Sequence, residues 1–102
     1  MDEVVPGLWL GAAYDTQNKE ILESLGITHI LSLGTPARSI PDGSINKYCE
    51  ILDNVKADIL SLLPECIDFI KEGLEGGKVI VHCSAGVSRS SSCVIAYIMQ
   101  TE

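Results

Sequence analysis

Cys83 and Arg89 are the two residues whose types and spacing most clearly indicate chemistry. The five residues between them are Ser, Ala, Gly, Val and Ser. One turn of such a loop can bring a sulfur and a guanidinium to one centre, while its backbone N–H groups point inward and bind an anion. Arg89 can bind two oxygens of a tetrahedral oxyanion at once. Because these surroundings favour the thiolate form of Cys83, the pattern predicts a nucleophile that attacks phosphorus.

The residues on either side of this loop predict the elements that hold it in place. Residues 79–82 are apolar or β-favouring and predict a strand that ends at the cysteine. A long apolar run follows Ser90 and predicts a helix that begins near Arg89. The start of a helix presents unpaired N–H groups and the positive end of its dipole, so it would strengthen an anion site.

The string His82-Cys83-(five residues)-Arg89-Ser90 resembles the signature of the cysteine-dependent protein phosphatases. Its continuation from Ala85 to Ser90, followed by the apolar residues 94–99, resembles the dual-specificity branch in particular. A bare Cys-x5-Arg spacing arises often by chance, whereas about a dozen matching positions form a specific signal. Without the resemblance, an ordinary strand–loop–helix unit with a packed cysteine would be the alternative.

The resemblance implies a protein phosphatase that hydrolyses phosphotyrosine and phosphoserine or phosphothreonine through a cysteinyl-phosphate intermediate. Cys83 would be the nucleophile, Arg89 would bind the phosphoryl oxygens, and Ser90 would stabilise the leaving thiolate. The expected phosphate-binding residues are Ser84, Ala85, Gly86, Val87, Ser88 and Arg89. His82 would be structural, orienting the loop rather than acting as a base. The expected partners are phosphorylated proteins, and no metal or organic cofactor is implied.

A proton donor for the leaving oxygen is also required by this chemistry. The resembling family has an aspartate at the end of a strand that precedes the cysteine. Asp53 falls at that place, thirty residues before Cys83. Asp58 is the alternative, although it lies where the start of a helix would favour a capping carboxylate.

The composition restricts the classes of function. A chain of 102 residues has room for one small domain, expected over residues 1–102. The net charge of −7 disfavours nonspecific binding to nucleic acid or to an anionic membrane surface. No apolar run approaches the length needed to span a membrane. The four cysteines have no C-x-x-C spacing, so neither a disulfide framework nor a zinc site is expected, and the cytoplasm or nucleus is favoured.

Hydrophobic patterning and the resemblance together predict a phosphatase-like α/β fold that is short at its C-terminus. Its centre would be a mostly parallel, twisted sheet of four to five strands flanked by helices. Extended segments are expected within residues 1–11, 27–33, 47–52 and 79–82, and a surface loop over 34–46. Helices are expected from a cap at Asp15 or Thr16 to Gly26, and over residues 56–74. The second helix would contain Pro64 and end at Gly73, Gly76 and Gly77.

The last residues lead to two further expectations. Members of the resembling family continue with one or two more helices, whereas this sequence stops at Glu102. The apolar helix expected over residues 93–99 would then leave an exposed face, so we expect either a homodimer through this face or a domain of marginal stability. The same shortness keeps open an alternative function, that of a phosphate- or phosphoprotein-binding module with little or no turnover.

A few residues and enzyme classes stay open beside this interpretation. Arg38 could contact a second phosphate, although a solvated loop arginine is commoner. Cys49, expected on a strand next to that of Cys83, could trap the oxidised nucleophile in a disulfide, although a packed thiol is the simpler reading. Trp9 is expected in the core or at the rim of the site. An arsenate reductase would need further redox cysteines, and the loop of a sulfurtransferase usually differs after the cysteine.

Overall fold

The computed structural model describes residues 2–34, 36–49 and 56–83. In chain order the elements are β1 (Asp2–Val5), β2 (Leu8–Ala12), the short 3₁₀ helix η1 (Ala13–Thr16), α1 (Lys19–Ser24), β3 (Ile27–Leu33), β4 (Ile45–Cys49), α2 (Lys56–Gly76) and β5 (Lys78–Cys83). The predicted strands and the long second helix are therefore confirmed. Strand β4 begins two residues before the predicted start, because Ile45 already pairs with His29 of β3.

The five strands form one sheet in the order β1-β2-β5-β3-β4. Strand β1 pairs with β2 in the antiparallel direction, and the other three pairings are parallel. The prediction of a mostly parallel sheet is confirmed. Strand β5 lies in the middle, with two strands on each side, so the strand that carries Cys83 is the most protected of the five.

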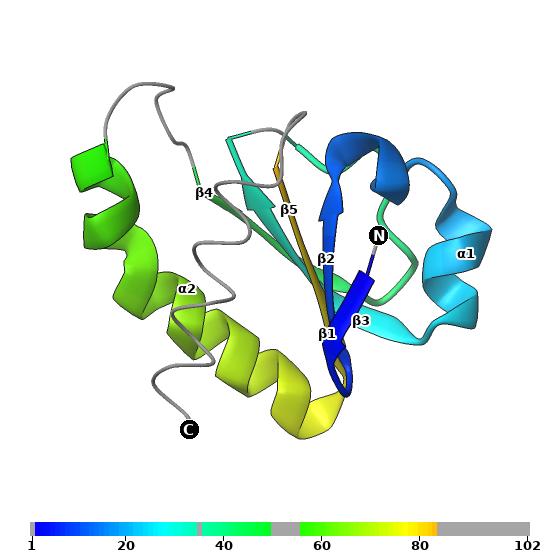
Figure 1. Ribbon diagram of the computed structural model, residues 1–102. Helices are drawn as coiled ribbons and strands as arrows, with labels where there is room; N and C mark the ends of the chain where they lie inside the picture. Colours follow the sequence, from blue (N-terminus) through cyan, green and yellow to red (C-terminus); the bar gives the residue numbers. More distant parts are fainter. Residues whose placement is uncertain (1, 35, 50–55, 84–102) are drawn as a thin grey trace.

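The sheet is covered on both faces, by α2 on one side and by α1 on the other (Figure 1). Side chains alternate along each strand, so β5 contributes Val79 and Val81 to the α2 side and Ile80 to the α1 side. The α2 side is closed by Cys66, Phe69 and Ile70, packed with Leu8, Leu31 and Leu33. The α1 side is closed by Leu22, packed with Trp9, Ile27 and Ile30. Trp9 therefore belongs to the core.

Helix α1 begins later than the sequence pattern predicted. Its cap is Asn18, whose Oδ1 accepts hydrogen bonds from the backbone N–H groups of Glu20 at 3.0 Å and Ile21 at 3.2 Å. The predicted caps were wrong because the 3₁₀ turn η1 intervenes. Asp15 instead accepts from the backbone N–H of Ala12 at 2.8 Å. The predicted stop is confirmed, since Gly26 has a φ of 78°, a conformation that favours glycine.

Helix α2 continues past one of its predicted ends. Gly73 lies inside the helix, which runs to Gly76, so the prediction that Gly73 ends it was wrong. A Cβ at Gly73 would overlap Val79 of β5 and lie 3.0 Å from the ring of His29. Glycine is required there because the helix lies so close to the sheet.

Candidate active site

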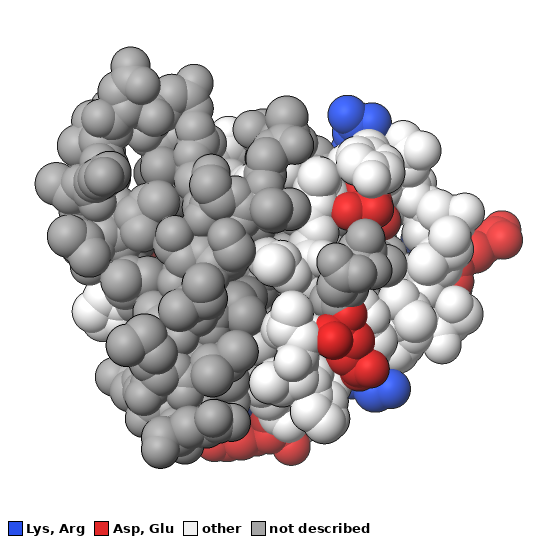
Figure 2. All heavy atoms as spheres, in the orientation of Figure 1, with Lys and Arg blue, Asp and Glu red and all other residues white. Residues whose placement is uncertain are grey.

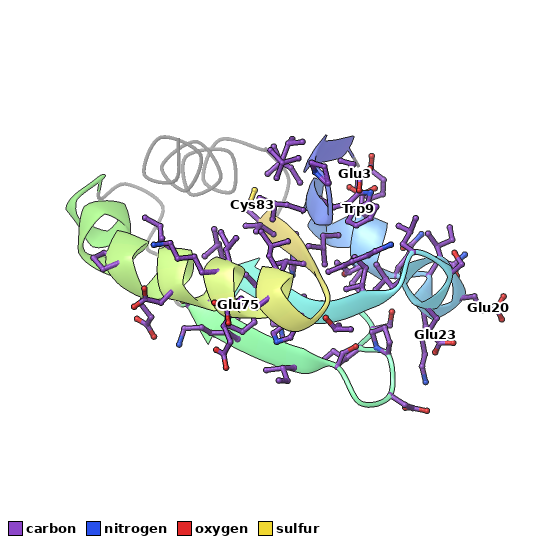
Figure 3. The ribbon with its side chains drawn as sticks, turned by 90° about the horizontal axis from the view of Figure 1, so that it is seen from below. Glu3, Trp9, Glu20, Glu23, Glu75 and Cys83 are labelled. Atoms are coloured by element: carbon purple, nitrogen blue, oxygen red, sulfur yellow. The ribbon has the colours of Figure 1, made fainter. Side chains whose placement is uncertain are left out.

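The parallel register brings the carboxyl ends of four strands to one edge of the sheet. Ala12 of β2 pairs with Cys83 of β5. On the other side of β5, Ser32 of β3 pairs with His82, and the next residue of β3, Leu33, pairs with Cys49 of β4. Ligands of open parallel sheets bind outside this edge. Cys83 is thus the last residue of the central strand, at the place where the fold favours a site (Figure 3).

Cys83 is buried, with 2% of its surface exposed, and its side chain lies in the core cluster on the α2 side. Apart from His82, the other predicted site residues lie outside the described part of the chain: Asp53, Ser84, Ala85, Gly86, Val87, Ser88, Arg89 and Ser90. Their approach to Cys83 stays a prediction. The helix predicted over residues 93–99 also lies outside the described residues. The homodimer expected through this helix therefore stays a prediction.

His82 is fully buried on the face of β5 opposite to the side chain of Cys83, and it belongs to a series of linked hydrogen bonds. Its Nε2 lies 2.7 Å from Oγ of Ser32. The same Oγ accepts from Nδ2 of Asn46 at 2.9 Å, and this amide also donates to the carbonyl of Ile30 at 3.0 Å. Sequence reasoning missed Ser32 and Asn46. The one signal was a serine inside the apolar strand sequence Ile-Leu-Ser-Leu.

Burial lowers the pKa of His82, and the backbone of Cys83 and the carboxylate of Asp15 oppose this only in part. The imidazole is therefore neutral at physiological pH. A neutral ring cannot stabilise a thiolate by its charge, so any effect of His82 on the loop must act through hydrogen bonds. The structural role expected of His82 stays a prediction.

Figure 2 shows acidic and basic groups scattered over the described part of one face, without a basic patch. Within residues 2–34, 36–49 and 56–83, no three His, Cys, Asp or Glu side chains are placed to hold a metal ion. No helix in those same ranges has the length and apolar character needed to cross a membrane.

A family model of the dual specificity phosphatase catalytic domain matches residues 8–102. The chain belongs to this family. Human dual specificity protein phosphatase 1 is 42% identical over 101 residues, which cover 97% of this chain and 28% of that protein. Dual specificity protein phosphatase 1B of Arabidopsis thaliana is 36% identical over 102 residues, 98% of this chain and 61% of that protein. The chain thus spans only part of its curated relatives.

Solved structures agree with this assignment. The crystal structure of DUSP15 superposes with a TM-score of 0.87 at 35% identity, covering 99% of this chain and 65% of that one. The human tyrosine phosphatase-like serine/threonine/tyrosine-interacting protein gives a TM-score of 0.84 at 35% identity, with 97% and 72% covered. The predicted dual-specificity phosphatase fold is confirmed.

Cys49 does not lie on the strand next to that of Cys83, so this expectation was wrong, and the simpler reading of a packed thiol holds. Strand β3 lies between β4 and β5, and the register places Leu33 between Cys49 and Cys83. Two strand spacings separate their Cα atoms by about 10 Å, beyond the ~7 Å that a disulfide allows. Burial, followed by the neighbouring Cys66 thiol, raises the pKa of Cys49 to about 12. Cys49 is therefore a neutral, packed thiol.

The loop that carries Arg38 is fixed close to the same edge of the sheet. The backbone N–H of Arg38 donates to Oγ1 of Thr16 at 2.8 Å, and its Nη1 donates to Oε1 of Gln17 at 3.1 Å. Thr16 is fully buried at the end of η1, which directly follows β2. This anchors the loop, while a contact between Arg38 and a second phosphate stays a prediction.

Proposed function

We propose that this chain is the catalytic domain of a protein phosphatase that hydrolyses phosphotyrosine and phosphoserine or phosphothreonine in phosphorylated proteins. The observation that carries the proposal is the place of Cys83, at the carboxyl end of the central parallel strand and within the family match over residues 8–102. We place the enzyme in the cytoplasm or nucleus, where a reducing environment keeps the nucleophilic thiol reduced.

In the first step, the thiolate of Cys83 attacks phosphorus. An S–P bond forms as the ester P–O bond breaks, and Asp53 gives its proton to the departing oxygen. Arg89 and the backbone N–H groups of residues 84–88 bind the three equatorial oxygens, where negative charge is held during the transfer. The products are the dephosphorylated protein and phosphocysteine.

In the second step, the carboxylate of Asp53 accepts a proton from a water molecule that attacks the phosphocysteine. The S–P bond breaks, inorganic phosphate leaves, and the electron pair returns to sulfur. Ser90 donates a hydrogen bond to the departing thiolate of Cys83. Protons and electrons balance without an oxidant or a metal ion, so these side chains suffice for the whole cycle.

The deciding experiment compares hydrolysis of phosphotyrosine and phosphothreonine peptides by the wild type and by Cys83→Ser. We expect turnover of both peptides by the wild type and none by the variant, which keeps its fold and still binds the peptide. Cys49→Ser is the matched control, because it replaces an equally buried thiol at the same sheet edge and should retain turnover. Turnover by Cys83→Ser would refute the mechanism. Binding of phosphopeptides by an inactive wild type would identify a binding module instead.

A further inference from the structure

The hydrogen bonds around His82 form a directed chain that crosses three strands. Asn46 on β4, Ser32 on β3 and His82 on β5 lie on the face of the sheet that α1 covers, opposite the side chain of Cys83. Ser32 and His82 are fully buried. Because a buried polar group without a partner is costly, the placement of every hydrogen in this chain has energetic consequences.

Counting hydrogens gives the chain its direction. The carbonyl of Ile30 can only accept, so the nitrogen of the Asn46 amide must face it. The second hydrogen of this amide goes to Oγ of Ser32. Among the described residues, the only other partner of that Oγ is Nε2 of His82. The single hydroxyl hydrogen of Ser32 therefore goes to Nε2, which accepts it.

The direction of the chain determines which nitrogen of the neutral ring carries the proton. If Nε2 accepts, the hydrogen of the imidazole must be on Nδ1. Nδ1 is buried and finds no hydrogen-bond partner of good geometry within residues 2–34, 36–49 and 56–83. The backbone of Cys83 lies near enough to raise the pKa of His82, against the larger effect of burial. The Nδ1–H therefore lies near the backbone of Cys83, the last residue of β5.

We propose that Ser32 and Asn46 are positioning residues that hold His82 as its Nδ1–H tautomer, so that this N–H faces the backbone of Cys83 and holds the end of β5 in place. The proposal rests on the proposed function, because it assigns these residues to the same site. With the opposite tautomer, a lone pair instead of a donor would lie beside the backbone of Cys83. Small displacements of a reacting group cost large factors in rate, on the order of a hundredfold for 1 Å.

Asn46→Asp is the sharpest test, because it reverses the direction of the hydrogen bonds from residue 46 to His82 while keeping the shape of the side chain. The new carboxylate accepts the hydroxyl hydrogen of Ser32, so Ser32 must accept from His82 and the ring proton moves to Nε2. Asn46 is exposed on the edge strand, which lets water hydrate the charge and the domain fold. Asn18→Asp is the matched control, since aspartate caps a helix as well as asparagine does.

The primary readout is the nitrogen NMR spectrum of the His82 ring. We expect Nδ1 protonated in the wild type and in Asn18→Asp, and Nε2 protonated in Asn46→Asp. In Ser32→Ala, the wild-type hydrogen-bond signature at Nε2 should be lost. The kcat on a phosphotyrosine peptide should fall about ten- to a hundredfold in both site variants, with a smaller change in KM. Ser24→Ala, which removes an exposed hydroxyl of α1, should change neither quantity.

The outcomes separate this proposal from the proposed function. A wild-type ring protonated on Nε2, or ring signals that do not change in Asn46→Asp and Ser32→Ala, would overturn the chain of hydrogen bonds even in an active phosphatase. Ring signals that move without any loss of kcat would overturn the positioning role. If the wild type turns over no phosphopeptide, the proposed function fails, and alkylation of Cys83 by iodoacetamide from about pH 5 to pH 8 then reports the positioning of Cys83.

Discussion

The two ends of the central strand β5 are held by different kinds of contact. At the amino end, Oγ1 of Thr28 accepts from the backbone N–H of Lys78 at 3.0 Å. A Cβ on the neighbouring Gly77 would overlap that hydroxyl. At the carboxyl end, His82 and Ser32 are buried polar side chains joined by a hydrogen bond of 2.7 Å. At the amino end, close packing restricts which side chains can be accommodated. At the carboxyl end, the restriction is the direction of the hydrogen bonds between buried polar groups.

Because the two ends differ in this way, substitutions in one strand should affect stability at one end and activity at the other. A substitution at the amino end should unfold part of the population and leave each folded molecule fully active. A substitution at the carboxyl end should leave most molecules folded and make each one slower, because it disturbs groups around Cys83. Activity per folded molecule and the free energy of unfolding are therefore the two quantities to compare.

The largest effect is expected from Asp53→Ala. Loss of the proposed general acid should lower kcat by about two to four powers of ten on phosphoserine or phosphothreonine peptides, whose leaving oxygens need a proton. A nitrophenyl phosphate should be affected much less, because its leaving group departs without protonation. Asp58→Ala serves as the control and should lose little on either substrate. Equal losses on both substrates would remove Asp53 from this role.

At the crowded end, Gly73→Ala should reduce stability without touching the chemistry. The new methyl group would overlap Val79 and crowd His29, which we expect to cost about 1–3 kcal/mol of unfolding free energy. Gly76→Ala lies one turn further along α2, where a Cβ meets nothing within 4 Å, and should stabilise the helix by about 0.5–1 kcal/mol. Urea titration measures both variants. Equal stabilities, or a slower folded Gly73→Ala enzyme, would contradict the separation.

Local sequence patterns were enough to predict the strands and the place of Cys83 at the end of one of them. Residues 79–82 form a run of strand-favouring residues that leads directly to Cys83, and Gly26 ends α1 where its pattern indicated. The cap of α1 was mispredicted for a local reason as well. Asp15, Thr16 and Asn18 are all good caps, and only the intervening 3₁₀ turn selects the last of them.

Long-range pairing was beyond the reach of the same patterns. Gly73 looked like a helix stop, because the sequence does not show that Val79 lies against it. Cys49 was expected on a strand next to that of Cys83, because local periodicity does not reveal the order of strands in a sheet. The hydrogen bonds from Asn46 through Ser32 to His82 join three strands, so no single segment carries their signal.

A moderate, pH-dependent effect is expected from the buried imidazole. Burial lowers the pKa of His82 from 6.5, so the folded state keeps the ring neutral where the unfolded chain already takes up a proton. The unfolded state then binds more protons, and stability falls as pH falls below about 6.5, by at most about 1.4 kcal/mol per pH unit. Urea midpoints between about pH 7.5 and pH 5.5 should fall more steeply for the wild type than for His82→Asn. Parallel slopes would contradict this assignment.

The smallest effect is expected at Cys49, which shares the carboxyl edge with Cys83 without reaching it. Oxidation by peroxide proceeds through a thiolate, and a pKa of about 12 keeps the Cys49 thiol protonated at neutral pH. Leu33 separates the two cysteines across β3, so a sulfenic acid on Cys83 finds no partner there. Cys49→Ser should therefore leave the rate of peroxide inactivation unchanged, and peptide mapping should detect no Cys49–Cys83 bridge. A bridge that is present in the wild type would require β4 and β5 to approach each other, against the observed strand order.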